Sequence, residues 1–389
     1  MKFLLVCDYD LDYVGGAQTA FVAQAKALHD AGHSVAVMAP RARLVADLPS
    51  VEVINPPGTV RVPGAGLPVF RFGRGLERWM RRTLAAAAPD AVVVHSEFGL
   101  AAAAVTTASA MGIVTLHTVH TFFWRAPKAA GPAAPALRGL YRLFTRQKAP
   151  RAKLSDRPAD SALRSMTLAM ARRADVVLSP SGHQAQKLRA AGAQNVVVLS
   201  NASKRTAQPQ PLPRSVPLRL AWIGRFAPEK RLEVALEAMQ ILLDRQVPVL
   251  LEIAGGDLAR HPVNVRCIGS IPQEQVEQLL LRSHLAVQTS LGFDNQPMVM
   301  VEACAASRGI VVSDPVLAEE FADAAVLASS TDAAGLAATL EALTADWAAV
   351  TAASCAAGER AAESAPTAHA RKLAAIVTAE RKRQSRLGA

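Results

Sequence analysis

The sequence predicts an α/β protein with two doubly wound domains, each a parallel sheet covered by helices on both faces. Three observations lead to this prediction. Short runs of Val, Ile and Leu alternate with helical stretches along both halves of the chain, as is typical of strands buried on both faces. The chain has 389 residues, which is too many for one ordinary hydrophobic core. A stretch with four prolines, 201–217, interrupts the alternation.

The first half opens with a strand predicted at 3–7, followed by a helix that starts at Gly15-Gly16 and runs to about residue 31. Further strands are predicted at 34–38, 51–54, 91–94, 113–116, 176–178 and 196–199, with a helix at 183–191 between the last two. Residues 125–158 fall outside this order. They are rich in Ala, Pro, Arg and Lys, and we expect one or two amphipathic helices there.

The second half repeats the pattern after the Pro-rich linker. Strands are predicted at 218–223, 249–254, 265–268, 285–288 and 310–312, and helices at 231–243, at 273–282 and from about residue 297. We therefore expect a first domain at 1–205, which includes the basic excursion 125–158, and a second domain at 206–360. We expect the remaining residues, 361–389, to form a basic, Ala-rich helix that packs back towards the first domain.

The chain is strongly basic, with a formal net charge of +11. Twelve Lys and Arg stand against two Asp between residues 121 and 174, and six against one Glu between 371 and 389. Such surfaces attract anionic lipid, phosphorylated small molecules or nucleic acid, and otherwise keep a protein in solution. Because no nucleic-acid-binding motif accompanies the charge, a nucleic-acid partner is not expected.

The cysteines and the N-terminal residues indicate a cytoplasmic protein. Four cysteines are scattered without a CxxC pair or a nearby histidine, so neither a disulfide framework nor a zinc site is expected. The apolar run at 3–7 is too short for a signal peptide or a membrane span.

Two cations follow the strand predicted at 218–223. The strand ends in Gly224, and Arg225 and Lys230 lie on the loop after it. Open α/β sheets bind ligands at the carboxyl ends of their strands. Arg as a fork and Lys as a point charge suit a diphosphate there. Taken alone, such a pair is more often ordinary surface charge, so this interpretation depends on the other motifs.

Two acids mark the stretch FDNQPMVMVEA at 293–303. Asp294 precedes the predicted helix and Glu302 lies within it, with apolar residues at 298–301 between them. A carboxylate at the helix start can accept hydrogen bonds from sugar hydroxyls, and Glu302 can accept them from ribose. The alternative is helix capping by Asp294 and an exposed Glu302.

The first half offers weaker signals. Gly15 and Gly16 open a helix where a phosphate can approach the backbone, but a tight turn explains them equally well. His117 and His120 follow the strand at 113–116. We favour His120 as the residue that contacts a sugar hydroxyl or developing charge, and His117 as structural.

Several reaction classes are disfavoured. The chain has no nucleophile elbow, Walker loop, HExxH or three-glycine dinucleotide fingerprint, which argues against serine hydrolases, nucleoside triphosphatases, zinc peptidases and dinucleotide oxidoreductases. The letters DYD at 8–10 match a DxD metal motif, a match that we attribute to chance. No metal is expected.

Taken in order, the motifs resemble family 4 of the retaining glycosyltransferases. The matching stretches are GGAQ at 15–18, HTVH at 117–120, SPSGHQ at 179–184, SNAS at 200–203, GRFAPEK at 224–230 and DNQPMVMVEA at 294–303. Their order along most of the chain is more specific than any one of them. The resemblance implies the GT-B fold, in which an acceptor-side and a nucleotide-sugar domain, both Rossmann-like, face each other across a cleft.

The resemblance also implies an enzyme, a hexosyltransferase whose co-substrate is GDP-mannose or a UDP-sugar, with no cofactor and no metal. The hexose would pass to an acceptor hydroxyl with retention, the departing phosphate helping to deprotonate the acceptor. The implied catalytic residues are His120, Asp294, Arg225 and Lys230, and the implied donor-binding residues are Gly15, Gly16, Gly224, Arg225, Lys230, Asp294, Asn295, Gln296 and Glu302.

Three positions depart from the family pattern. Asp294 stands where the family usually has Glu, Asn295-Gln296 replaces a Phe-Gly pair, and Ala202 replaces the Gly of an Asn-Gly turn. The first two leave the identity of the donor open.

The basic excursion suggests an acceptor on a membrane. Arg138, Arg142 and Arg146 alternate with leucines and aromatic residues, a pattern that can lie in an anionic interface. We therefore expect a lipid-linked acceptor or cell-envelope glycan precursor, and a peripheral location on the inner face of the plasma membrane. The alternatives are an inert basic membrane-surface binding protein on this scaffold and a sugar-nucleotide epimerase of the same fold.

Overall fold

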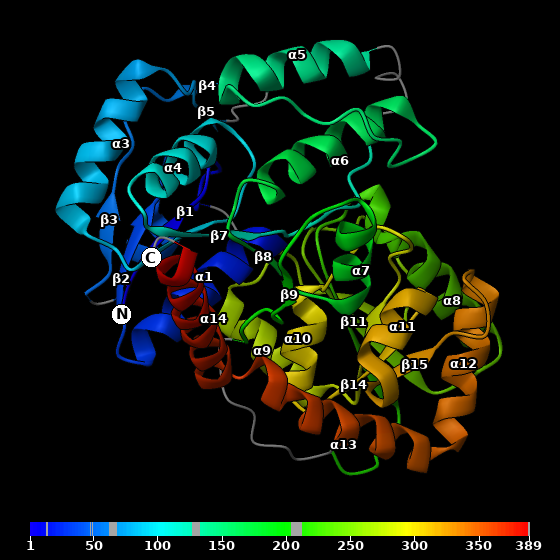
Figure 1. Cartoon of the computed structure of the whole chain (residues 1–389). Helices are drawn as coiled ribbons and strands as arrows, with labels where there is room; N and C mark the ends of the chain where they lie inside the picture. Colours follow the sequence, from blue (N-terminus) through cyan, green and yellow to red (C-terminus); the bar gives the residue numbers. More distant parts are fainter. Residues whose placement is uncertain are drawn as a thin grey trace. The chain divides into compact units, whose positions relative to one another are not determined.

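The computed structural model describes residues 1–12, 15–46, 48, 50–61, 68–126, 133–203 and 212–387 (Figure 1). The chain divides into two compact units: Met1–Ser200 with Pro366–Ala389, and Asn201–Ala365. The divisions fall at Asn201 and Pro366, where the sequence suggested 206 and 361. Half of the predicted Pro-rich linker, residues 204–211, lies outside the described residues.

The first unit contains a parallel sheet with the strand order β3-β2-β1-β6-β7-β8-β9. Its strands are β1 Lys2–Val6, β2 Ser34–Met38, β3 Glu52–Ile54, β6 Ala91–Val94, β7 Val114–Thr118, β8 Val176–Ser179 and β9 Val196–Val198. Its helices are α1 Gly16–Asp30, α2 Arg43–Ala46, α3 Arg74–Ala87, α4 Gly99–Ala110, α5 Ala134–Thr145, α6 Pro158–Ala171, α7 Gly182–Ala190 and α14 Pro366–Leu387. A short antiparallel pair joins β4 Val60–Arg61 and β5 Pro68–Val69.

Alternate residues of β1 enter two different hydrophobic cores. Phe3 and Leu5 pack in a cluster with residues of α1 and α14, whereas Leu4 and Val6 pack in a cluster with residues of α3 and α4. Successive side chains of a strand point to opposite faces, so a strand that is apolar throughout must be covered on both sides. The uninterrupted hydrophobic run of β1 is explained by these two layers.

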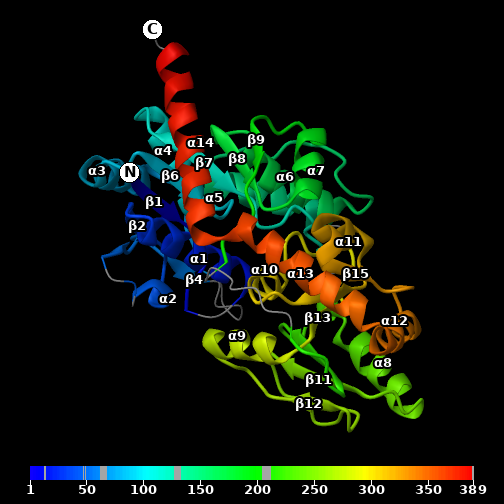
Figure 2. The same cartoon turned by 90° about the horizontal axis from the view of Figure 1, so that it is seen from below.

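The C-terminal helix α14 lies against α1 in the first unit (Figures 1 and 2). Ala370, Leu373 and Val377 form a buried apolar stripe at helical spacing and belong to the same cluster as Phe3. The helix begins at Pro366 rather than at the predicted residue 361, because proline fits the first turn of a helix and disfavours helical backbone before it.

The second unit contains a parallel sheet with the order β12-β11-β10-β13-β14-β15. Its strands are β10 Leu218–Ile223, β11 Val249–Ala254, β12 Val265–Cys267, β13 Leu285–Gln288, β14 Gly309–Val312 and β15 Ala325–Leu327. Its helices are α8 Leu232–Asp244, α9 Gln273–Arg282, α10 Met298–Ala305, α11 Pro315–Phe321, α12 Ala333–Ala345 and α13 Trp347–Ser364. The sequence missed β15, since three residues within an Ala-rich stretch give no periodic signal.

Each sheet reverses its winding at one central strand. In the first unit β1 pairs with both β2 and β6, and in the second β10 pairs with both β11 and β13. The carboxyl ends of the strands beside such a reversal border the crevice where open α/β sheets bind ligands. The predicted site residues Gly15, His120, Arg225, Lys230 and Asp294 all follow strands at these edges.

A buried carboxylate joins the end of β1 to the start of α4. The backbone N–H groups of Leu100 and Ala101 donate to Asp8 at 2.6 and 3.1 Å, and the Ser96 hydroxyl donates to it at 2.7 Å. Asp10, the other acid of the DYD letters, forms a two-pronged pair with Arg61 at 2.8 and 3.0 Å. Both carboxylates therefore bond within the unit.

We expect Asp8→Ala to lower the free energy of unfolding by about 2 kcal/mol, because buried N–H groups at the start of α4 lose their acceptor. Urea unfolding followed by circular dichroism measures the change. Asp30→Ala is the control, since Asp30 makes only an exposed helical pair with Lys26 and should cost less than about 0.5 kcal/mol. Equal losses in the two variants would contradict this account of Asp8.

Candidate functional site

Glycines bring the ends of β10 and β11 into backbone contact. A Cβ at Gly255 would lie 1.9 Å from the carbonyl oxygen of Gly224, and Gly255 has a φ of +130°. A Cβ at Gly256 would lie 2.9 Å from the ring of Phe226. Only glycine allows this approach, which shapes the loop that carries Arg225 and Lys230. Gly255 and Gly256 are not among the predicted site residues, although a Gly-Gly pair directly after a predicted strand was the available signal.

Lys230 and Asp294 are brought together at the edge of the second sheet. The Lys230 ammonium donates to both carboxylate oxygens of Asp294 at 2.8 Å, and the amide of Gln288, the last residue of β13, donates to the same carboxylate at 3.1 Å. The side chains of Lys230 and Asp294 are 17% and 10% exposed. The result is a largely buried ion pair made by residues that follow two adjacent strands.

The backbone of Lys230 is fixed from the core. The indole N–H of Trp222, a fully buried residue of β10, donates to the Thr289 hydroxyl at 2.9 Å. That hydroxyl donates in turn to the Lys230 carbonyl at 2.7 Å. Thr289 comes directly after β13, so one side chain ties together the loops that follow β10 and β13.

The other predicted donor-site residues of this unit have separate partners. Arg225 is 64% exposed and pairs with Glu229 at 3.4 Å, outside the Lys230–Asp294 cluster. Glu302, in α10, accepts a hydrogen bond from Gln273 of α9. Asn295 and Gln296 are buried.

Gln296 has a structural contact within the second unit. Its amide oxygen accepts from the backbone N–H of Asn201 at 2.8 Å. Gln296, which the resemblance implies as a donor-binding residue, therefore positions the first residue of the unit.

Gly15 and Gly16 form the start of α1 in the first unit. Gly15 has extended backbone and, lacking a side chain, gives the helix no side-chain cap. A Cβ at Gly16 would meet no atom of the described residues within 4 Å. Packing within that part of the chain does not demand glycine at this position.

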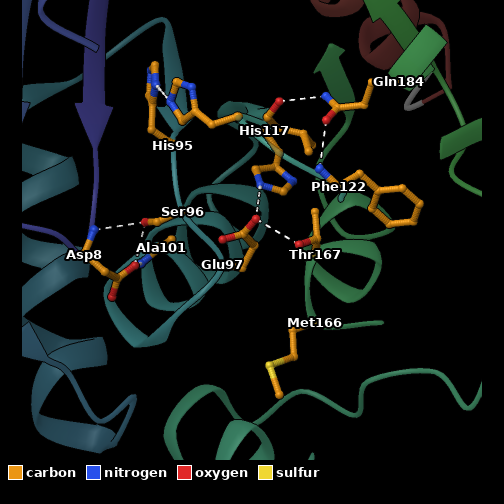
Figure 3. Close-up of polar contacts among 12 residues, drawn as sticks. Asp8, His95, Ser96, Glu97, Ala101, His117, Phe122, Met166, Thr167 and Gln184 are labelled. Atoms are coloured by element: carbon orange, nitrogen blue, oxygen red, sulfur yellow. Dashed lines mark hydrogen bonds and ion pairs between the residues drawn. The ribbon is translucent and has the colours of Figure 1, made fainter. Parts of the chain in front are cut away.

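His117 is a residue of β7 and is fully buried. Neither of its ring nitrogens has a hydrogen-bond partner among the described residues, and its Nε2 lies 4.0 Å from the Glu97 carboxylate (Figure 3). The Thr167 hydroxyl donates to Glu97 at 3.0 Å. Burial raises the pKa of Glu97 to about 7 and lowers the pKa of His117 to about 3, so His117 is neutral at neutral pH.

His120 lies two residues beyond β7, and its Nε2 is 2.9 Å from Nδ1 of His95. His95 comes directly after β6, the strand beside β7, and is followed by Ser96 and Glu97 (Figure 3). Burial lowers the pKa of His120 to about 4, so its ring is neutral at neutral pH. His95 is not among the predicted site residues, although it follows an apolar strand, the same signal that favoured His120.

The three arginines of the basic excursion that we expected at a membrane differ in their surroundings. Arg142 is exposed, Arg138 is half-buried, and Arg146 pairs with Glu77 at 3.0 Å while its guanidinium lies over the ring of Phe72. All belong to α5 or its end, beside Leu140 and Leu143, which are each 51% exposed. Part of the excursion, residues 127–132, lies outside the described residues.

The described residues contain neither a cluster of metal ligands nor a membrane-spanning helix. No three His, Cys, Asp or Glu side chains within the described ranges are grouped so as to hold a metal ion. In the same part of the chain, no helix combines the length and apolar character that crossing a membrane requires.

Two family models match the chain. The model of Glycosyltransferase Family 4 matches residues 14–203, and that of Glycosyl transferases group 1 matches residues 217–346. A phosphatidyl-myo-inositol mannosyltransferase of Mycolicibacterium smegmatis is 26% identical over 363 residues, which cover 87% of this chain and 84% of the relative.

Solved structures share the fold over nearly the whole chain. The Anabaena protein HepE, in complex with UDP and glucose, is 14% identical with a TM-score of 0.66, and the match covers 97% of this chain and 100% of that one. Sucrose-phosphate synthase from Thermosynechococcus elongatus is 15% identical with a TM-score of 0.64, and both chains are covered completely. The two family matches together span most of the sequence, and the chain belongs to the family 4 glycosyltransferases, enzymes with the GT-B fold that transfer a sugar from a nucleotide sugar.

Proposed function

We propose that this enzyme transfers a hexose from GDP-mannose or a UDP-sugar to an acceptor hydroxyl, with retention of configuration and without a metal. The observation that carries the proposal is the Lys230–Asp294 pair at the winding reversal of the second sheet. It joins a cation suited to a diphosphate with an anion suited to sugar hydroxyls.

Lys230 is the residue that we expect to stabilise the leaving diphosphate. An ammonium has three N–H groups, and two donate to Asp294. The third is available to a phosphate oxygen, whose negative charge grows as the glycosidic bond breaks. The exposed guanidinium of Arg225 provides a second cation for the same oxygens.

Asp294 is proposed to accept hydrogen bonds from the donor sugar, and Glu302 from the ribose. Asn295 stays in the proposed donor site, whereas Gln296 contributes by holding Asn201. In the first unit, the open space at Gly16 suits a close approach of substrate to the start of α1. His120, neutral and placed at a strand end, is proposed to contact the sugar near the transition state.

Retention without a metal is proposed to follow a front-face path. The departing phosphate takes the proton from the acceptor hydroxyl on the face that it leaves, so the enzyme supplies charge stabilisation and not a nucleophile. The internal bonds of Asp8 and Asp10 support metal independence, since the DYD letters then have a structural explanation. A rate that survives EDTA is the expected outcome.

A lipid-linked acceptor is supported by two observations. The similar mycobacterial protein is a phosphatidyl-myo-inositol mannosyltransferase. Leu140, Leu143 and Arg142 are exposed together on α5, a combination of apolar and basic groups that suits an anionic membrane surface. We therefore propose a peripheral enzyme that reaches its acceptor from the membrane face.

Nucleotide binding tests the donor site. We expect UDP or GDP at one hundred times its dissociation constant to stabilise the protein by about 2.7 kcal/mol, raising the melting temperature. Lys230→Ala should lose most of this shift, because the diphosphate loses its cation and Asp294 keeps an uncompensated charge.

Arg282→Ala is the matched control. It breaks the Arg282–Glu252 pair, made at 2.9 and 3.1 Å in the same unit, and should lower the melting temperature while preserving the nucleotide-dependent shift. An undiminished shift in Lys230→Ala, or no response of the wild-type protein to any nucleotide, would overturn the proposed donor site.

Gly16→Ala tests whether substrate occupies the space beside α1. A methyl group there meets no described atom, so stability should stay within about 0.5 kcal/mol of the wild type. The rate of sugar transfer should fall at least about tenfold if substrate approaches the backbone. Gly75→Ala is the control, since a Cβ at this α3 residue also meets open space. Full activity in Gly16→Ala would remove this residue from the site.

Vesicle binding tests the proposed membrane surface. The double variant Arg142→Glu, Leu143→Asp should bind phosphatidylglycerol-containing vesicles at least about tenfold more weakly, because one attractive charge near the membrane contributes about 1 kcal/mol and the variant reverses it. The double variant Arg260→Glu, Val263→Asp places the same charge change on exposed residues of the second unit and should bind as the wild type does. Sedimentation with vesicles measures both, and equal binding by the two variants would contradict a role for α5.

A further inference from the structure

A chain of hydrogen bonds leads from α14 to His120. Nδ1 of His369 lies 2.8 Å from the carbonyl oxygen of Ser200, and its Nε2 lies 2.9 Å from Nε2 of Gln24. Oε1 of Gln24 is 2.9 Å from Nε2 of His95, whose Nδ1 is 2.9 Å from Nε2 of His120. All five residues belong to the first unit, and three elements, α14, α1 and the loop after β6, supply the links.

The Ser200 carbonyl, at the start of this chain of hydrogen bonds, fixes which group donates in every later bond. A backbone carbonyl only accepts, so Nδ1 of His369 carries the hydrogen and, in a neutral ring, Nε2 accepts from the Gln24 amide. The amide oxygen of Gln24 then faces His95, whose Nε2 must donate and whose Nδ1 must accept. His120 therefore donates through Nε2. Any other assignment sets two hydrogens or two lone pairs against each other.

The premise that these rings are neutral is supported by their environment. Gln24, His95 and His369 are buried. Burial lowers the pKa of His369 to about 4 and that of His95 well below its usual value, and neighbouring histidines add to the effect at His95. A neutral imidazole has one donor and one acceptor nitrogen, so a chain of such rings transmits a tautomer from one end to the other.

We propose that His369, Gln24 and His95 are positioning residues that hold His120 as the Nε2–H tautomer, with Nδ1 as its acceptor nitrogen, from an anchor at the Ser200 carbonyl. The consequence for catalysis rests on the proposed function, in which His120 contacts the sugar. The C-terminal helix then has a chemical role in addition to its packing: its fourth residue, His369, fixes the ring of a residue that comes far earlier in the chain.

Nitrogen NMR of the full chain labelled with 15N-histidine tests the tautomers without requiring activity. Long-range 1H–15N spectra distinguish Nε2–H from Nδ1–H rings, and His120→Gln, His95→Gln and His369→Gln assign the three signals. We expect His95 and His120 as Nε2–H and His369 as Nδ1–H. Any other pattern in the wild-type protein overturns the proposal.

Gln24→Leu distinguishes an effect of the hydrogen bonds from an effect of packing. Leucine has a similar size to glutamine but makes neither the bond to His369 nor the bond to His95. We expect His369 to remain Nδ1–H through Ser200, while His95 and His120 become mixtures of tautomers. Gln24→Glu should preserve the Nε2–H form of His95 and His120, because its carboxylate still accepts from His95. His33→Leu, at a histidine outside the chain of bonds, is the control. An unchanged His120 in Gln24→Leu would show that packing alone sets its ring.

Kinetics separates this proposal from the proposed function. We expect His369→Leu to lower kcat about tenfold while the KM for the donor changes less than about twofold, and the double variant with Gln24→Leu to lose no more than either single variant. A tautomer change without loss of kcat would leave the chain of bonds established and refute the role of His120 in the reaction. Additive losses in the double variant would contradict transmission through Gln24.

Discussion

The parallel pairing of β10 with β13, and of β6 with β7, is the constraint on which both candidate sites depend. Parallel strands end at a common edge, so residues far apart in sequence meet there as soon as the sheet forms. In the second unit this edge brings Lys230, after β10, to Asp294, after β13. In the first it brings His95, after β6, to His120, after β7. The hydrophobic cores stabilise the sheets, and the sheets fix the geometry of the polar residues at their ends.

Burying those polar residues costs free energy, so each of them has a hydrogen-bonding partner in the structure. A charge held away from water must be matched, as the Lys230 ammonium is by both oxygens of Asp294. The histidines avoid the same cost by staying neutral, as the lowered pKa of His120 indicates. If the pair served only to stabilise the fold, apolar residues of equal size would stabilise it equally well. Its location at the winding reversal is what suggests a role with substrate.

The sequence predicted the parts that depend on local pattern. Largely apolar runs predicted β10 and β11 with the bounds observed, although each strand carries one charged residue, Arg219 and Glu252. Motif order predicted the family, which the family models confirm.

Local sequence pattern could not predict contacts between segments that are far apart in the chain. Gln24 and His369 are 345 residues apart, and no periodicity links them. The cap that Asp8 provides for α4, and the use of Gln296 to hold Asn201, likewise depend on which loops the sheet brings together.

The most direct test of the central claim is the anomeric configuration of the first product. GDP-α-mannose and UDP-α-glucose are each incubated with the enzyme and EDTA, with water as the slow acceptor, and the released sugar is followed by proton NMR before it equilibrates. The account predicts that the α-anomer appears first, together with one equivalent of nucleoside diphosphate, and that Lys230→Ala slows its release. Initial release of the β-anomer, a strict requirement for metal, or epimerised sugar nucleotide in place of free sugar would contradict it.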